Sequence, residues 1–86
     1  MRLVMIEWLD SMGVGGEWQC PDCLKDPEPV VCRSVGWIVR ETEDYIVVAS
    51  HHHAGDCNEE ASEQVCGTMA ITKATVRRIT DLIFYA

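Results

Sequence analysis

The residues best suited to chemistry lie in two short segments, "CPDC" and "HHH". Cys20 and Cys23 have the spacing at which two thiolates bind one tetrahedral zinc ion. His51 and His53 would point to the same side of a continuing strand, so this pair could supply the other two ligands. These four residues would together form a zinc site of the Cys2His2 type.

Other readings of the same residues stay open. A single CxxC motif is weak support for zinc, and the further ligand candidates are Cys32, His52, Cys57 and Cys66. In the alternative interpretation Cys32 and Cys66 are small buried hydrophobic residues and the histidines are exposed. A redox role would need a helix after Cys20, and none is predicted. We therefore expect no cofactor, with zinc as the alternative.

A local group of basic residues suggests an anion site. Lys73, Arg77 and Arg78 form a positive island on an acidic chain. Trp18, in a glycine-rich segment, could stack on a base while a guanidinium binds a phosphate. These four residues predict binding of a small nucleotide, and the alternative is an ordinary solvated strand face.

The overall charge is negative, with 14 acidic and 7 basic residues and a net charge of −7. Such a chain would be repelled by the phosphates of bulk DNA or RNA. One stretch contains acids but no Lys or Arg, and it predicts a protein-interaction surface for a basic partner, made of Glu41, Glu43, Asp44, Glu59, Glu60 and Glu63.

Catalysis is not expected. The segment "HHHAGDCNEE" contains thiol, imidazole and carboxylate groups, but a polar loop gives a catalytic set little rigid support. The chain has no nucleophile elbow, phosphate-binding loop or metalloprotease helix. The sequence favours a protein that binds rather than one that catalyses.

The first half of the chain predicts one strand, a long loop and a strand pair. "LVMIEWLD" alternates, with Val4, Ile6 and Trp8 on one face, and residues 11–29 are a loop rich in glycine and proline. "VVCRSVGWIVRE" and "DYIVVAS" follow as strands joined by the turn "ETED".

Within the first strand of that pair the two faces differ. One face carries Val31, Val35, Trp37 and Val39, and the other carries Cys32 and Ile38. Gly36 is typical of a bulge or sharp bend. Trp8 and Trp37 are expected in the core.

The second half predicts an exposed loop over about 51–64, a strand in "VCGTMAI", a tight turn in "TKAT" and a last strand in "VRRITDLIF". The last segment also fits helical spacing, but its β-branched residues favour a strand. The fold class is therefore mainly β, in a single domain over residues 1–86. We expect a small, strongly bent, five-stranded barrel with a long N-terminal loop and a one-turn helix before the last strand.

This order of elements resembles the Sm-like and SH3-like barrels, and "GTMAITKATVRRITDL" is similar to the closing segment of Sm-like proteins. The segments "IEWLDS", "CRSVGWIVRETEDYIVVA" and "CGTMAITKATVRRI", together with Trp18, resemble a family of small uncharacterised bacteriophage and prophage proteins, over most of the chain outside the two loops. That resemblance implies a phage gene expressed in the cytoplasm of a bacterial host.

A cytoplasmic location also agrees with the residues. No apolar run approaches the roughly 20 residues that cross a bilayer, and Glu7 and Asp10 interrupt the amino terminus. Cytosolic thiols stay reduced, and five cysteines are an odd number for a disulfide framework.

We expect a non-enzymatic phage accessory protein that binds a host component, either a protein or a small nucleotide signal, with inhibition of a bacterial defence as one such role. The alternative is an Sm-like oligomeric module that binds RNA or has a structural role. Such a module could be stabilised by zinc. A homo-oligomer is expected in either case, because the apolar end "LIFYA" offers a packing surface.

Overall fold

The computed structural model describes residues 1–11, 16–55 and 62–83. In these residues the regular elements are five strands and two 3-10 helices, without an α-helix. Their bounds are β1 Leu3–Asp10, η1 Pro21–Cys23, β2 Val30–Glu41, β3 Tyr45–His53, β4 Gln64–Thr72, η2 Lys73–Thr75 and β5 Val76–Asp81. The predicted class, mainly β with five strands, is confirmed.

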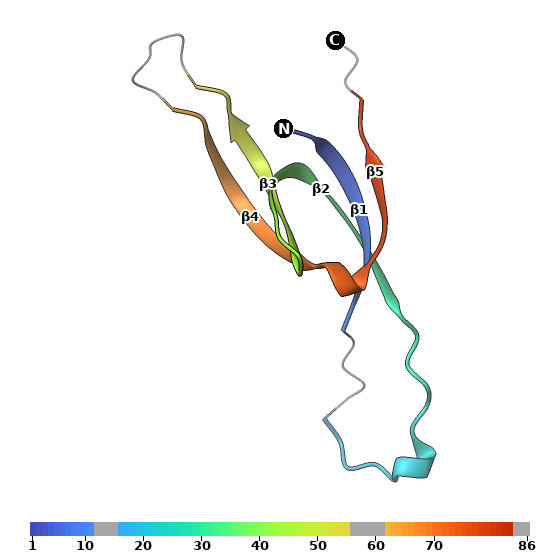
Figure 1. The fold of residues 1–86 in the computed structure, drawn as a ribbon. Helices are drawn as coiled ribbons and strands as arrows, with labels where there is room; N and C mark the ends of the chain where they lie inside the picture. Colours follow the sequence, from blue (N-terminus) through green and yellow to red (C-terminus); the bar gives the residue numbers. More distant parts are fainter. Residues whose placement is uncertain (12–15, 56–61, 84–86) are drawn as a thin grey trace.

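The five strands form one antiparallel sheet in the order β4-β3-β2-β1-β5 (Figure 1). β2 pairs with β1 from Val30 to Trp37 and with β3 from Trp37 to Glu41, so it crosses between the two sides of the fold. The register shifts between Ile38 and Arg40 in β2 and between Glu7 and Trp8 in β1. Such irregularities bend strands. β4 and β5 are the two edges, and closure of the sheet into a barrel stays a prediction.

The core lies on one face of this bent sheet. Its buried side chains come from three strands and are Val4, Ile6, Ile46, Val48 and Ile71, with Trp8, Ile38 and Val76 packed against them. Each fully buried aliphatic side chain contributes about 1.5–3 kcal/mol. Trp8 donates its indole N–H to Ser34 Oγ at 3.0 Å, which satisfies its polar group beside the core. The predicted face of Val4, Ile6 and Trp8 is confirmed.

The core face of β2 follows from the register. Ser34 lies opposite Ile6, and Ile38 lies opposite Val48, so the even-numbered side chains of this part of β2 face the core. Trp37 lies outside the core cluster, and its ring contacts that of His52. The expectation of a core position was therefore wrong for Trp37.

Gly36 lies in β2 close to the backbone of β3. A Cβ atom at this position would lie 2.7 Å from the carbonyl oxygen of Ala49. The register shift that the sequence placed at Gly36 occurs just after it, beyond Ile38. Gly36 is therefore required for the close approach of a neighbouring strand.

The β3–β4 hairpin is longer than the sequence suggested. The three histidines belong to β3, and their backbones pair with Gln64, Val65 and Cys66 of β4. A polar side chain does not prevent its own backbone from pairing. The hydrogen-bond ladder between β3 and β4 therefore continues through the polar histidine segment. The segment between β3 and β4 is therefore shorter than the predicted loop over 51–64, because β3 extends to His53 and β4 begins at Gln64.

The closing elements agree with the sequence. η2 is the single turn expected before the last strand, and Val76–Asp81 is a strand rather than a helix. In the described parts of the chain, no helix has the length and apolar character needed to cross a membrane.

Candidate functional site

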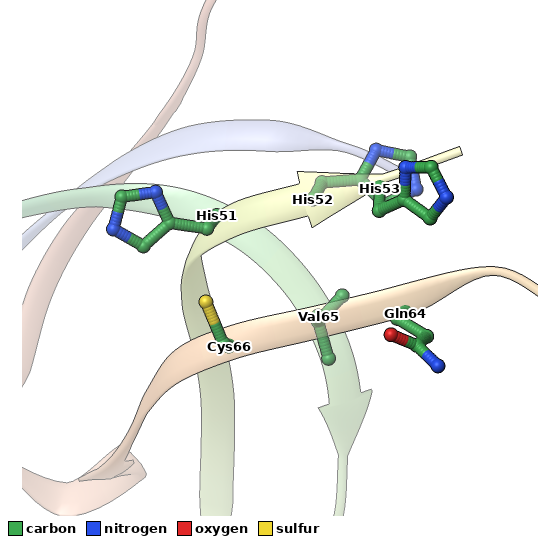
Figure 2. A pocket seen from close by; sticks show the side chains of 6 residues that line it. All are labelled: His51, His52, His53, Gln64, Val65 and Cys66. Carbon is green, nitrogen blue, oxygen red and sulfur yellow. The ribbon is translucent and has the colours of Figure 1, made fainter. Parts of the chain in front are cut away.

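A shallow cavity of about 210 Å³ lies at the end of the β3–β4 hairpin next to the segment that connects the two strands (Figure 2). Its lining comes from three consecutive residues of each of the two paired strands: His51, His52, His53, Gln64, Val65 and Cys66. His51 lies directly opposite Cys66, so the two side chains share one face of the hairpin. Figure 2 shows the Cys66 thiol directed toward β3. The hairpin thus brings together an imidazole and a thiol that are far apart in the sequence.

His52 is the most constrained of the three histidines. Its Nε2 lies 2.9 Å from Glu63 Oε2, and its ring centroid lies 5.6 Å from that of Trp37. The side chain is only 19% exposed. These contacts fix the ring between the hairpin and β2, so His52 supports the hairpin rather than offering a free ligand atom.

The cysteines of the "CPDC" motif lie on η1, within the long β1–β2 loop. The Cys23 amide donates to the Cys20 carbonyl oxygen at 2.9 Å, which closes the turn. The pKa of the exposed Cys20 thiol is lowered, mainly by a hydrogen bond from the Cys23 side chain and to a smaller extent by a hydrogen bond from the Asp22 backbone amide. Figure 1 shows η1 at the far end of this loop, on the opposite side of the molecule from the end of β3.

The structure therefore does not bring Cys20 and Cys23 together with His51 and His53. Within residues 1–11, 16–55 and 62–83, no group of three or more His, Cys, Asp or Glu side chains could hold one metal ion. Cys57 lies outside the described residues. Zinc binding by either pair of residues stays a prediction.

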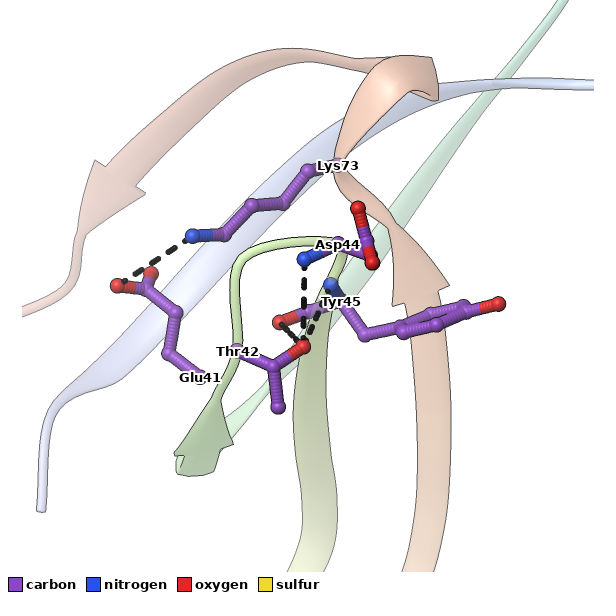
Figure 3. A network of polar contacts seen from close by, with 5 residues as sticks. All are labelled: Glu41, Thr42, Asp44, Tyr45 and Lys73. Carbon is purple, nitrogen blue, oxygen red and sulfur yellow. Dashed lines mark hydrogen bonds and ion pairs between the residues drawn. The ribbon is translucent and has the colours of Figure 1, made fainter.

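The four residues of the anion hypothesis are also dispersed. Lys73 Nζ lies 3.7 Å from Glu41 Oε2, so its charge is partly balanced (Figure 3). Arg78 lies opposite Glu7 on β1, whose carboxylate pairs with Arg33 at 3.1 Å. Trp18 is fully exposed in the long loop. Between the described residues, no ring contact joins Trp18 to either arginine.

The predicted acidic surface is divided between the two ends of β3. Glu41, Glu43 and Asp44 gather at the β2–β3 turn, where the Thr42 hydroxyl accepts hydrogen bonds from the amides of Asp44 and Tyr45 at 3.3 and 3.0 Å (Figure 3). Glu63 lies at the other end, beside His52. A nine-residue strand spans about 30 Å. Glu59 and Glu60 lie outside the described residues.

The sheet has a second apolar face, which we call the outer face; the sequence grouped Val31, Val35 and Trp37 on one side of their strand but did not predict that this side lies away from the core. It lies on the side of β1 and β2 opposite the core, and its members are Leu3, Met5, Leu9, Val31, Val35 and Trp37. Val35 is 55% exposed and Val31 is 39% exposed. The Glu7–Arg33 ion pair lies among them. The signal was present in both strands as apolar residues at odd as well as even positions.

Comparison of the chain with protein-family descriptions, with curated proteins and with solved structures finds no match in any of the three.

Proposed function

We propose that this protein is a non-enzymatic accessory protein that acts by binding and occupying a partner protein. The observation that carries the proposal is the outer face. It places apolar side chains of two paired strands on the side away from the core, and Val31 and Val35 remain exposed.

The outer face has the composition of a binding surface. Removal of apolar surface from water contributes about 25 cal/mol per Å² to the free energy of association. A partner that covers the exposed side chains of Val31 and Val35 would therefore be bound more tightly. The Glu7–Arg33 pair and Arg78 place charges beside these apolar side chains. An apolar patch combined with charged groups is typical of protein recognition.

A protein partner is better supported than a small nucleotide. Trp18, Arg78 and Lys73 do not converge on one pocket in the described structure, and Lys73 already has a carboxylate neighbour. A compact anion would need several of these groups at once.

The charge of the chain favours a basic partner. The net charge is −7, and Glu41, Glu43 and Asp44 form an exposed acidic group at the β2–β3 turn. Complementary charges raise the rate of association more than the final affinity. This acidic turn would therefore guide a basic partner toward the neighbouring sheet.

The proposal extends to the origin of the gene. In line with the resemblance to small phage proteins, the partner would be a component of the bacterial host, met in its cytoplasm, and a defence protein is one such target. Blocking by occupancy needs only affinity, which suits a small domain with a small core.

The test compares two charge substitutions at exposed residues. Val35→Glu places a carboxylate on the outer face, whereas Ala74→Glu makes the same change in charge on η2. Tagged wild-type protein and both variants would be used to isolate partners from a bacterial host, and the affinity of the purified partner for each would then be measured by calorimetry.

We expect the Val35→Glu variant to lose binding by at least about tenfold, and the Ala74→Glu variant to bind like the wild type. Circular dichroism would check that both variants fold. A partner whose affinity is the same for all three proteins would contradict the proposed use of the outer face.

A second proposal, an Sm-like structural or RNA-binding module, is favoured by one observation. The strand order β4-β3-β2-β1-β5, with a 3-10 turn before the last strand, agrees with such a barrel. The net charge of −7 opposes RNA binding. Native mass spectrometry would test this alternative, since a ring of several copies, with or without zinc, supports it and a monomer or dimer contradicts it.

A further inference from the structure

β4 is an unusual edge strand. It pairs with β3 on one side, and its other side ends the sheet (Figure 1). All of its residues except Ile71 are exposed. Its nine residues, "QVCGTMAIT", include no charge and no proline, although the backbone is irregular at Gly67, where φ is +66°. Soluble proteins usually protect a long edge with such residues, because unpaired backbone groups attract another strand.

The charges next to β4 are arranged symmetrically. Glu63 directly precedes the strand and Lys73 directly follows it, so each lies five positions from Thr68. Both side chains are accessible, with 58% exposure for Glu63 and 36% for Lys73. An edge with an acid at one end and a base at the other is complementary to itself in antiparallel orientation.

We propose that two copies of this chain associate through β4, in an antiparallel pairing with the two-fold axis at Thr68. This register brings Glu63, just before β4 in each copy, close to Lys73, the first residue of η2 in the other copy, where their side chains can form two ion pairs between the copies. It also places Cys66 opposite Ala70 of the second copy and Gly67 opposite Met69 of the second copy. Small residues thus lie opposite or next to larger ones.

The contacts that Glu63 and Lys73 make within one copy do not oppose this pairing. Glu63 contacts His52 at 2.9 Å, and Lys73 contacts Glu41 at 3.7 Å. Each carboxylate has a second oxygen and the ammonium group has three donors, so both can accept a further partner. The uncharged strand between them lets two acidic chains approach without placing like charges in contact.

The pairing joins two sheets into one and leaves the outer face open. The outer face belongs to β1 and β2, which are separated from β4 by β3 in the sheet order. The dimer is thus independent of the proposed binding function. It would present two outer faces in one assembly, which strengthens binding to a partner with repeated sites.

The test is a charge exchange, measured by sedimentation equilibrium in low-salt buffer with a reducing agent. We expect the wild type to dimerise. Glu63→Lys and Lys73→Glu should each raise the dimer dissociation constant by about tenfold, because each replaces two attractive pairs with two repulsive ones. The double exchange, Glu63→Lys with Lys73→Glu, should restore the wild-type constant to within about twofold.

Substitutions at Thr68 locate the axis. Thr68→Lys would place two ammonium groups side by side and should abolish the dimer, whereas Thr68→Val keeps a β-branched, uncharged residue and should preserve it. Circular dichroism of each variant at low concentration would check that the single copy still folds.

Three outcomes would overturn the inference. They are a wild type that stays monomeric up to millimolar concentration, an assembly larger than a dimer, and a dimer that is unaffected by both the charge exchange and Thr68→Lys. If Val35→Glu rather than Thr68→Lys disrupted the dimer, the outer face would be the site of self-association instead. The binding test with Val35→Glu is read on a purified partner, so the two proposals can fail separately.

Discussion

At position 36 the backbones of β2 and β3 leave no room for a side chain. A Cβ atom there would lie 2.7 Å from the Ala49 carbonyl oxygen and 3.3 Å from Val48 Cβ, a core side chain. A backbone carbonyl cannot rotate away as a flexible side chain does. The glycine is thus a condition for the two halves of the sheet to pack.

We therefore predict that Gly36→Ala lowers the free energy of unfolding by about 1–3 kcal/mol, because overpacking forces the strands apart. The measurement is urea denaturation followed by tryptophan fluorescence. Gly16→Ala is the matched control, since nothing lies within 4 Å of a Cβ at that position. Equal stabilities of the two variants would show that the strands separate without cost.

The second residue-scale prediction concerns Cys20. A hydrogen bond from the Cys23 side chain is the largest of the effects that lower the pKa of the Cys20 thiol, so Cys20 is a thiolate at lower pH than an ordinary cysteine. Cys23→Ala removes that donor. The pH midpoint for alkylation of Cys20 by iodoacetamide should therefore shift upward.

Mass spectrometry of the peptide that contains Cys20 would give the alkylation rate at each pH. Cys66→Ala is the control and should leave the profile unchanged, since Cys66 lies on β4, far from η1 in Figure 1. An unchanged profile in Cys23→Ala would mean that the backbone donors alone set the pKa. Because Cys20 is exposed, no dependence of folding stability on pH follows from this shift.

At the scale of elements, the long loop and the sheet are separable. Asp10 lies opposite Val30, so the two strands already meet at the point where the loop begins and ends. The described loop residues, 16–29, are all exposed. These described loop residues contribute no side chain to the core cluster.

Replacing residues 11–29 with Asn-Gly should therefore preserve the fold. Two residues are enough to join antiparallel strands, and the shorter connection lowers the entropy cost of closing the loop by about 1–2 kcal/mol. We expect a thermal midpoint equal to or above that of the wild type, measured by circular dichroism. Loss of a cooperative transition would show that the loop is needed to complete the core.

At the scale of the whole molecule, a single copy has a small interior. Its radius of gyration is 18.2 Å, whereas a compact chain of this length has about 12 Å. The hydrophobic residues classed as buried in the described structure are Val4, Ile6, Ile46, Val48, Ala49 and Ile71. Domains of this size often gain stability from association.

Two surfaces could supply that association, and they differ in character. The β4 edge offers backbone groups and a symmetric pair of charges, whereas the outer face offers apolar side chains beside an ion pair. An edge is suited to a second copy, since pairing there is antiparallel and self-complementary. The outer face is suited to a different protein.

The sequence by itself determined the strands, the loop that separates the first two and the turn before the last. These features depend on neighbouring residues, such as alternation in "LVMIEWLD" and glycine and proline in the loop, so they can be predicted without knowledge of the rest of the chain. The second face of β2 was also visible as a pattern. Its position relative to the core was not.

Only the tertiary structure decided which residues meet. It placed His51 opposite Cys66, and it separated Cys20 and Cys23 from both histidine candidates. It also divided the acidic stretch between the two ends of β3. The physical reason is that alternation fixes the faces of each strand, whereas pairing order, register and bending fix the distances between strands. Those depend on contacts between residues that are far apart in the sequence.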